Sequence, residues 1–155
     1  MAMQVHLATD HAGYAHKNAV SDWLISEGYA VKDHGALVYD PQDDFPDYIV
    51  RAAQAISSNP PDRAIIFGGS GQGEAMLANR FPAVRATVLY SDNAEIVELS
   101  RAHNDANVLS IGARFLSVDD TKKHIWNWLH AKRSDVERHN RRIEKVAAIT
   151  KNIHT

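Results

Sequence analysis

The residues from Gly68 to Glu74 combine four glycines with one carboxylate, a combination that could create and hold a negative charge during a reaction. They follow the apolar run Ala64–Phe67 and precede the helix-compatible stretch Ala75–Asn79, an order that predicts strand, glycine-rich turn and helix. Glycines permit a sharp turn and a close approach of backbone N–H groups to a ligand, and free amides at a helix N-terminus bind anions. Because Glu74 would repel a bound phosphate, we expect the anion to arise during catalysis, when Glu74 removes a proton.

The spacing of the glycines excludes two better-known phosphate loops. A Walker loop requires Lys and then Ser or Thr after its last glycine, whereas Gly73 is followed by Glu74 and Ala75. The dinucleotide fingerprint G-x-G-x-x-G fits Gly69 and Gly71 but requires a third glycine at position 74. On the glycines alone, a tight strand-to-helix turn without a ligand remains an alternative.

Composition narrows the classes of function. The 155 residues suit one domain with a substantial core, and a hydrophobic content of 45% fits a soluble globular protein. A formal net charge of −2 provides no broad basic field, so we expect no nucleic-acid partner. Cysteine is absent, which excludes disulfides and thiol nucleophiles. No signal-like start and no apolar run of about 18 residues occur, so we expect a cytoplasmic protein that binds no membrane.

Strand and helix patterns alternate along the chain and position these chemical groups. Strands are predicted at residues 5–8, 29–32, 63–67, 86–89 and 107–111. Longer helices are predicted at residues 14–27, 49–56, 92–103, 118–131 and 135–150. Asp92 is a plausible N-cap or first-turn acid of the third of these helices, and residues 40–47 form a polar loop. The alternation predicts one α/β domain over residues 1–155. We expect a Rossmann-like three-layer sandwich with a five-stranded parallel sheet and helices on both faces.

Polar residues gather where such a sheet binds ligands, outside the carboxyl ends of its strands. Asp10 and His11 follow the first strand, Ser70–Glu74 follow the third, and Arg114 follows the fifth. The segment His103–Asp105 ends a helix just before the fifth strand and need not share that edge. Each residue alone has a simpler reading: a helix cap, a surface histidine, a half-buried histidine or a solvated arginine. Their convergence is what indicates a site.

The last predicted helix carries a basic cluster. Arg138 and Arg142 are four residues apart and share one helix face, with His139 and Arg141 close by. Guanidinium groups offer forked donors to phosphate oxygens, so the cluster could bind phosphate; a solvated basic face is the alternative. The nine histidines show no paired ligand spacing and there are no thiolates, so we expect no metal.

In combination, these motifs resemble the B-type ribose-5-phosphate isomerases, a family that also includes the galactose-6-phosphate isomerase subunits. The motifs that carry the resemblance are Asp10-His11-Ala12-Gly13, Gly69–Gly73, Ala78-Asn79-Arg80, Ser100–Leu109, Gly112-Ala113-Arg114 and Arg138–Arg142. They span nearly the whole chain. One branch of the family carries a cysteine base directly after the third strand, where this chain has Gly68. Another branch uses a glutamate after the glycine loop, and Glu74 stands at that place.

The resemblance implies an enzyme without a cofactor that interconverts ribose 5-phosphate and ribulose 5-phosphate, a reaction of the pentose phosphate pathway, through a cis-enediolate. Glu74 would be the base, and His103 with Asp10 would open the sugar ring. The enediolate would be stabilised by the Ser70 hydroxyl and by the turn residues Gly69, Gly71, Gln72 and Gly73. Asn104 would hold a substrate hydroxyl. The residues implied in phosphate binding are His11, Arg114, Arg138, His139 and Arg142.

The resemblance also implies an assembly. The family forms homodimers with shared active sites, with tetramers as a further assembly, so the helix at 135–150 is expected to reach the partner subunit. Two alternatives remain open. The substrate could be a six-carbon sugar phosphate, such as allose or galactose 6-phosphate, or a four-carbon tetrulose phosphate. A non-catalytic phosphosugar- or nucleotide-binding module on the same sheet is the alternative of another class.

Overall fold

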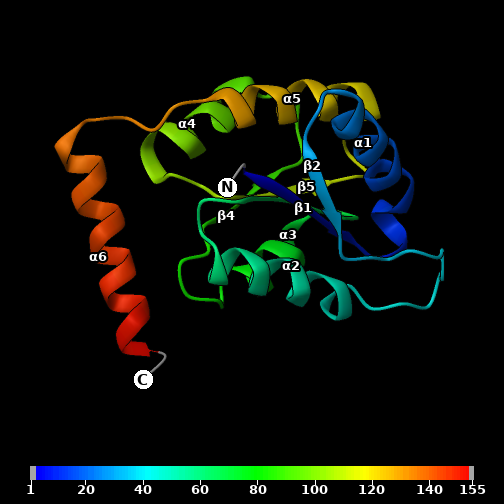
Figure 1. The fold of residues 1–155 in the computed structure, drawn as a ribbon, viewed down its shortest axis with the longest axis horizontal. Helices are drawn as coiled ribbons and strands as arrows, with labels where there is room; N and C mark the ends of the chain where they lie inside the picture. Colours follow the sequence, from blue (N-terminus) through cyan, green and yellow to red (C-terminus); the bar gives the residue numbers. More distant parts are fainter. Residues whose placement is uncertain (1–2, 154–155) are drawn as a thin grey trace.

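The computed structural model describes residues 3–153 as a parallel sheet between helices, with one helix standing apart (Figure 1). The strands are β1 (Gln4–Thr9), β2 (Ala30–Asp33), β3 (Arg63–Gly68), β4 (Ala86–Leu89) and β5 (Val108–Gly112). A short 3₁₀ helix, η1 (His11–Gly13), follows β1. The α-helices are α1 (Tyr14–Ser26), α2 (Pro46–Ser58), α3 (Gln72–Ala78), α4 (Ala94–Asn104), α5 (Val118–His130) and α6 (Glu137–Ile153).

The five strands pair in parallel in the order β2-β1-β3-β5-β4. Helices α2 and α3 cover one face of the sheet, and α1, α4 and α5 cover the other (Figure 1). This arrangement confirms the predicted five-stranded parallel sheet in a three-layer sandwich. Parallel strands joined by helices bring their carboxyl ends to one edge of the sheet, which is where ligands bind in such folds.

The central strand β3 explains why both faces are covered. Its side chains alternate between two apolar clusters: Ile65 and Phe67 pack on the side of Trp128 in α5, and Ile66 packs on the side of Ile49 in α2. All five of these side chains are buried. A strand buried on both faces reads as a continuous apolar run, and this is the pattern that the run Ala64–Phe67 shows in the sequence.

The predicted element boundaries differ from the structure by no more than three residues, and one difference matters for chemistry. The helix after the glycine turn begins at Gln72 rather than Ala75, so Glu74 lies in its first turn instead of in the loop before it. The turn therefore holds Glu74 on a helix, which fixes the direction of its side chain.

The prediction that Asp92 is the N-cap or a first-turn acid of the following helix is wrong, because Asp92 precedes the cap and Glu95 is the acid of the first turn. Asn93 is the N-cap of α4, and its side-chain oxygen accepts hydrogen bonds from the backbone N–H groups of Glu95 and Ile96 at 3.1 and 3.3 Å. Asp92 instead lies 2.8 Å from Nε2 of His124 in α5. The partner of Asp92 is 32 residues away in the sequence, which is why a local capping pattern misassigned it.

Helix α6 stands to one side of the sandwich, next to α4 and beyond the edge strand β4 (Figure 1). Three of its large apolar side chains, Val146, Ile149 and Ile153, are 57%, 60% and 73% exposed. None of the helices described between residues 3 and 153 is long and apolar enough to cross a membrane.

Candidate active site

The glycine turn is pinned between β3 and β5. Ala113 N–H donates to Gly68 O at 2.9 Å, and Arg114 N–H donates to Gly69 O at 3.1 Å. Gly71 adopts φ 77°, a left-handed conformation that glycine tolerates, and its carbonyl accepts a hydrogen bond from the Ser110 hydroxyl at 2.5 Å. The turn is therefore held rigidly at the carboxyl edge of the sheet before α3 begins.

The Glu74 carboxylate occupies the space in front of Gly68. A side chain on residue 68 would collide with both carboxylate oxygens of Glu74. The carboxylate can occupy this space only because residue 68 is glycine. Glu74 is only 5% exposed. Burial raises the pKa of its carboxyl group; its own backbone N–H opposes this shift and the nearby charge of Asp10 adds to it. A carboxylate with a raised pKa is a stronger proton acceptor than an ordinary one.

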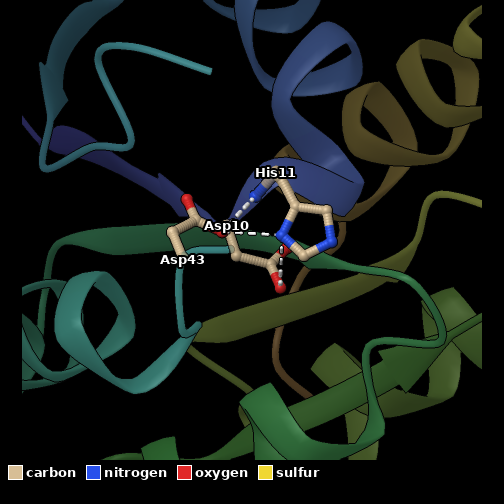
Figure 2. Close-up of side chains that lie close together, drawn as sticks. All are labelled: Asp10, His11 and Asp43. Carbon is tan, nitrogen blue, oxygen red and sulfur yellow. Dashed lines mark hydrogen bonds and ion pairs between the residues drawn. The ribbon is translucent and has the colours of Figure 1, made fainter. Parts of the chain in front are cut away.

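Two carboxylates and a histidine meet after β1, as Figure 2 shows. Asp10 accepts a hydrogen bond from Ala12 N–H at 3.0 Å and so caps η1, while its Oδ2 lies 3.9 Å from Nδ1 of His11. Asp43, from the loop before α2, lies 2.7 Å from the same nitrogen and accepts from His11 N–H at 3.0 Å. Asp10 thus has the capping role that the sequence allowed, and it also lies close enough to influence Glu74.

The remaining neighbours of the turn come from three other segments. The Arg114 guanidinium packs on Gly69, where a Cβ would lie 3.1 Å from its Nη1. Phe45, just before α2, packs on Gly73 in the same way, at 3.0 Å. The backbone N–H of Gln72 donates to the Ser70 hydroxyl at 3.4 Å. We call the residues gathered at this edge the turn group: Asp10, His11, Gly69, Ser70, Gly71, Gln72, Gly73, Glu74 and Arg114.

A second set of predicted site residues gathers around α4 and α6. The rings of His103 and His139 lie 4.1 Å apart, and Nε of Arg138 lies 3.4 Å from Nε2 of His139. Burial lowers the pKa of His139, and the charges of His103, Arg138 and Arg142 lower it further. Its Nδ1 is buried without a hydrogen-bond partner among residues 3–153. We call this set the helix group: His103, Asn104, Arg138, His139 and Arg142.

A cavity of about 420 Å³ lies between β4, α4 and α6 rather than at the glycine turn. Its wall includes Asn104 and Arg142 of the helix group, together with Val146 and Thr150 further along α6. The polar residues of the helix group therefore border an open space beside the edge strand.

The two groups lie at opposite edges of the sheet within one chain. The turn group follows the carboxyl ends of β1, β3 and β5, whereas α4 runs back along the sheet and ends before the first residue of β5. Since β5 has 5 residues, about 17 Å of strand separates the end of α4 from Arg114. Within residues 3–153, the structure brings the members of each group together, and the topology places the two groups at different ends of β5.

Comparison with known proteins places this chain. The sequence profile of the family described as Ribose/Galactose Isomerase matches residues 5–146. This protein belongs to that family. Ribose-5-phosphate isomerase B from Mycobacterium tuberculosis is 35% identical over 145 residues, which cover 94% of this chain and 88% of that protein. The corresponding Escherichia coli protein is 32% identical over 146 residues, covering 94% and 95% of the two chains.

Solved structures of family members share the whole fold. Ribose-5-phosphate isomerase B from Mycoplasma genitalium, solved with bound ribulose-5-phosphate, has a TM-score of 0.91 at 31% identity and covers 97% of this chain and 98% of its own. The Clostridium thermocellum protein has a TM-score of 0.90 at 34% identity, with 97% and 99% covered. The resemblance stated from the sequence motifs is confirmed.

Sequence reasoning missed Asp43. The segment 40–47 was read as a polar loop, and only its run of acids hinted at a site residue. The donor atoms of Asp10, His11 and Asp43 lie within 4.8 Å of one another, close enough for a metal ion to bridge. The direct contacts between His11 and Asp43 already account for this gathering, so we do not identify the three residues as metal ligands.

Proposed function

We propose that this protein is a B-type ribose-5-phosphate isomerase of the glutamate branch, with Glu74 as the base that moves a proton between C1 and C2 of the sugar. The position of Glu74 carries the proposal. A buried carboxylate in front of a side-chain-free Gly68 serves proton transfer and is of no use to a simple phosphate binder. The names of the relatives and the ribulose-5-phosphate bound to one of them support the choice of substrate.

The reaction follows from the groups around the turn. In the open-chain aldose, Glu74 takes the proton from C2, and the C2–H electron pair forms the C1=C2 bond of a cis-enediolate while O1 becomes negative. The turn amides and the Ser70 hydroxyl donate to that oxygen, an interaction for which losing one donor typically costs about 10²–10³ in rate. Glu74 then returns the proton to C1, O1 is protonated, and O2 loses its proton to become the ketone oxygen.

The helix group supplies the steps that the turn group does not. His103 would open the sugar ring with help from Asp10, and Asn104 would hold a substrate hydroxyl. Arg138, His139 and Arg142 would bind the phosphate together with His11 and Arg114. This division requires the helix group of one subunit to meet the turn group of another. We therefore propose a homodimer with two shared sites that acts on a sugar phosphate in the cytoplasm.

The exposed faces of the chain support such a dimer. Among residues 3–153, the edge strand β4 pairs only with β5, and α6 leaves Val146 and Ile149 more than half exposed next to β4. A twofold dimer uses the same surface twice, so one interface would complete both sites.

Substitution of the base tests the proposal. Purified wild-type protein should convert ribose 5-phosphate faster than four- and six-carbon sugar phosphates. Glu74→Gln should lower kcat by at least about 10²-fold, because the amide keeps the size of the side chain but cannot accept the proton, while substrate binding persists. The variant should also be at least as stable as the wild type at neutral pH, since burial penalises the charge that Gln removes.

Glu98→Gln, an exposed change of the same type on α4, should leave kcat unchanged. Wild-type turnover in Glu74→Gln would remove Glu74 as the base. A wild-type protein that binds sugar phosphates without converting any of them would instead indicate a binding module. Faster conversion of a six-carbon sugar phosphate than of ribose 5-phosphate would show that the preferred substrate has six carbons.

A further inference from the structure

Asp43, which lies in the loop before α2, contacts His11 through two hydrogen bonds. Among the contacts described for residues 3–153, no other side chain from this part of the fold does so. One oxygen, Oδ1, accepts from the His11 backbone N–H at 3.0 Å and lies 2.7 Å from Nδ1 of the ring. The second ring nitrogen of His11 points away from both carboxylates (Figure 2). A single side chain thus fixes both the backbone and the ring of the histidine.

The Asp43 carboxylate is nearly sealed from water. Its side chain is 5% exposed, and no well-aligned hydrogen bond from the described residues reaches its Oδ2. The Tyr48 hydroxyl lies near enough that Asp43 adds to the rise that burial causes in the pKa of Tyr48. A buried charge that is only partly paired is costly, so it favours a positive charge on the group that it touches. Asp43 also lies two residues before Phe45, the N-cap of α2, where the helix dipole favours a negative charge.

We propose that Asp43 is a positioning residue for substrate binding: it holds the Nδ1–H of His11, keeps the ring cationic and presents Nε2–H toward the phosphate of the substrate. The inference rests on the proposed function, which places His11 among the phosphate ligands. A carboxylate that accepts from one imidazole nitrogen sets which proton the other nitrogen carries. The cation then gives the phosphate a charge-assisted hydrogen bond, which is roughly twice as strong as a neutral one.

The pKa of His11 agrees with this geometry. The hydrogen bond to Asp43 raises the pKa of the imidazole above its ordinary value of 6.5, burial opposes the rise, and the charge of Asp10 adds to it. The charge of Arg114 lowers the pKa of His11, which is the expected cost of gathering cations for one phosphate. Asp43 offsets that cost.

The contact between Asp43 and His11 is one of several that connect the loop after β2 to the site. The Tyr14 hydroxyl donates to Leu37 O at 3.2 Å, and the Tyr39 ring meets the rings of His11 and Tyr14 edge-on at 6.4 and 5.9 Å. Among these contacts between the loop and the site, the one made by Asp43 involves a charged side chain, whereas those of Tyr14 and Tyr39 involve neutral rings and a hydroxyl group. Loss of the Asp43 charge should therefore act on His11 first, with the aromatic contacts still holding the loop.

Asp43→Asn tests the proposal, because the Asn oxygen can still accept both hydrogen bonds but carries no charge. Imidazole ¹⁵N resonances of His11 should titrate at lower pH in the variant than in the wild type. The KM for ribose 5-phosphate should rise at neutral pH by up to roughly tenfold, about the difference between a charged and a neutral hydrogen bond, with little change in kcat. At pH 6, where His11 is protonated without help, the KM ratio of variant to wild type should shrink.

Asp44→Asn, the exposed neighbour, is the matched control and should change neither the titration nor KM. In a His11→Gln background, Asp43→Asn should have no further effect on KM. An equal rise of KM at both pH values, or an unchanged His11 titration, would overturn the proposal. The titration of wild-type His11 needs no variant, and a midpoint at or below 6.5 would also overturn it.

The ¹⁵N titration and the binding of inorganic phosphate separate this inference from the proposed function. If the wild type isomerises no sugar phosphate, these two measurements still test whether Asp43 charges His11. If the isomerase activity is present and Asp43→Asn leaves the titration and phosphate affinity unchanged, only the role of Asp43 fails.

Discussion

At the scale of single residues, the chain separates two carboxylates by their surroundings. Asp10 accepts a backbone hydrogen bond as a cap of η1, whereas Glu74 is buried and its pKa is raised by burial and by the charge of Asp10. These different surroundings support the different tasks that we propose for the two groups, with Asp10 holding hydroxyl groups and Glu74 taking a proton from carbon.

The ring-opening role that we propose for His103 predicts a separation of two rates. Ribulose 5-phosphate is already open, because its phosphorylated O5 cannot close a five-membered ring. His103→Asn should therefore still exchange the C1 proton of ribulose 5-phosphate with solvent deuterium at close to the wild-type rate. Net conversion of ribose 5-phosphate should fall by about 10²-fold, the low end for acid–base catalysis. Proton NMR in deuterated buffer follows both reactions.

The control for this variant is the binding of inorganic phosphate, since His103 stacks on His139 and its loss could displace α6. Unchanged phosphate binding would show that the helix group is intact. If exchange and conversion then fall by the same factor, His103 acts in proton transfer or in holding the enediolate and not in ring opening.

Residue types pointed to some of the proposed site residues and gave no signal for others. Glu74 was evident because a carboxylate is unexpected within an anion-binding turn, and the structure adds that it fills the space in front of Gly68. Asp43 was not evident, because its value depends on contact with His11, 32 residues away. A polar loop rich in Asp looks the same whether its side chains face solvent or a buried histidine.

At the scale of elements, a partly buried polar chain joins the amino ends of β1 and β3 to the residue that follows β2. Nδ1 of His6 lies 2.8 Å from Nε2 of His34, and Nε2 of His6 lies 3.2 Å from Asp62. Asp62 also accepts from Gln4 N–H at 2.9 Å. These contacts tie the first residues of β1 to the residues before β3 and after β2.

This chain of groups predicts acid sensitivity. Burial, together with the charges of His6, Lys32 and Arg51, lowers the pKa of His34 to about 4, while the charge of Asp33 opposes the shift. Between pH 6.5 and about 4 the unfolded chain binds more protons at this residue than the folded chain, so the free energy of unfolding should fall as pH falls. His34→Gln should make the free energy of unfolding fall less steeply with pH, and the change in slope should correspond to less than one bound proton. Urea unfolding at several pH values measures it.

At pH 8 neither state of His34 is charged, so wild type and variant should there differ only by a pH-independent amount that reflects packing. A His34→Gln curve that runs parallel to the wild-type curve from pH 8 to pH 4 would show that His34 does not control the acid response.

Element prediction succeeded where the signal is local. The apolar run of β3 and the glycines after it predicted a strand and a turn, and both are present. Asp92 does not cap α4, because its partner is the distant His124. Helix α2 begins earlier than predicted, at Pro46, a residue type that fits the first turn of a helix. The distance between His103 and Glu74 could not be read from either helix alone, since it depends on the direction of α4 across the sheet.

At the scale of the whole molecule, we propose that one chain presents two incomplete halves of a site. The turn group lies at the carboxyl edge of the sheet, and the helix group lies beside β4 and α6 with a cavity of about 420 Å³ next to it. The central claim is that these halves meet across a twofold axis, so that the base of one subunit works with the phosphate-binding arginines of the other.

Mixing two inactive variants tests that claim most directly. Glu74→Gln damages the turn group and Arg142→Ala damages the helix group, so each homodimer should be nearly inactive. Random subunit exchange gives about half mixed dimers, each with one intact site of two, so activity should recover to roughly a quarter of the wild-type value. Two variants of the same group, Arg138→Ala and Arg142→Ala, should not rescue each other. Absence of recovery in the first mixture, with exchange verified by mass spectrometry, would place the base and the arginines in one chain and contradict the account.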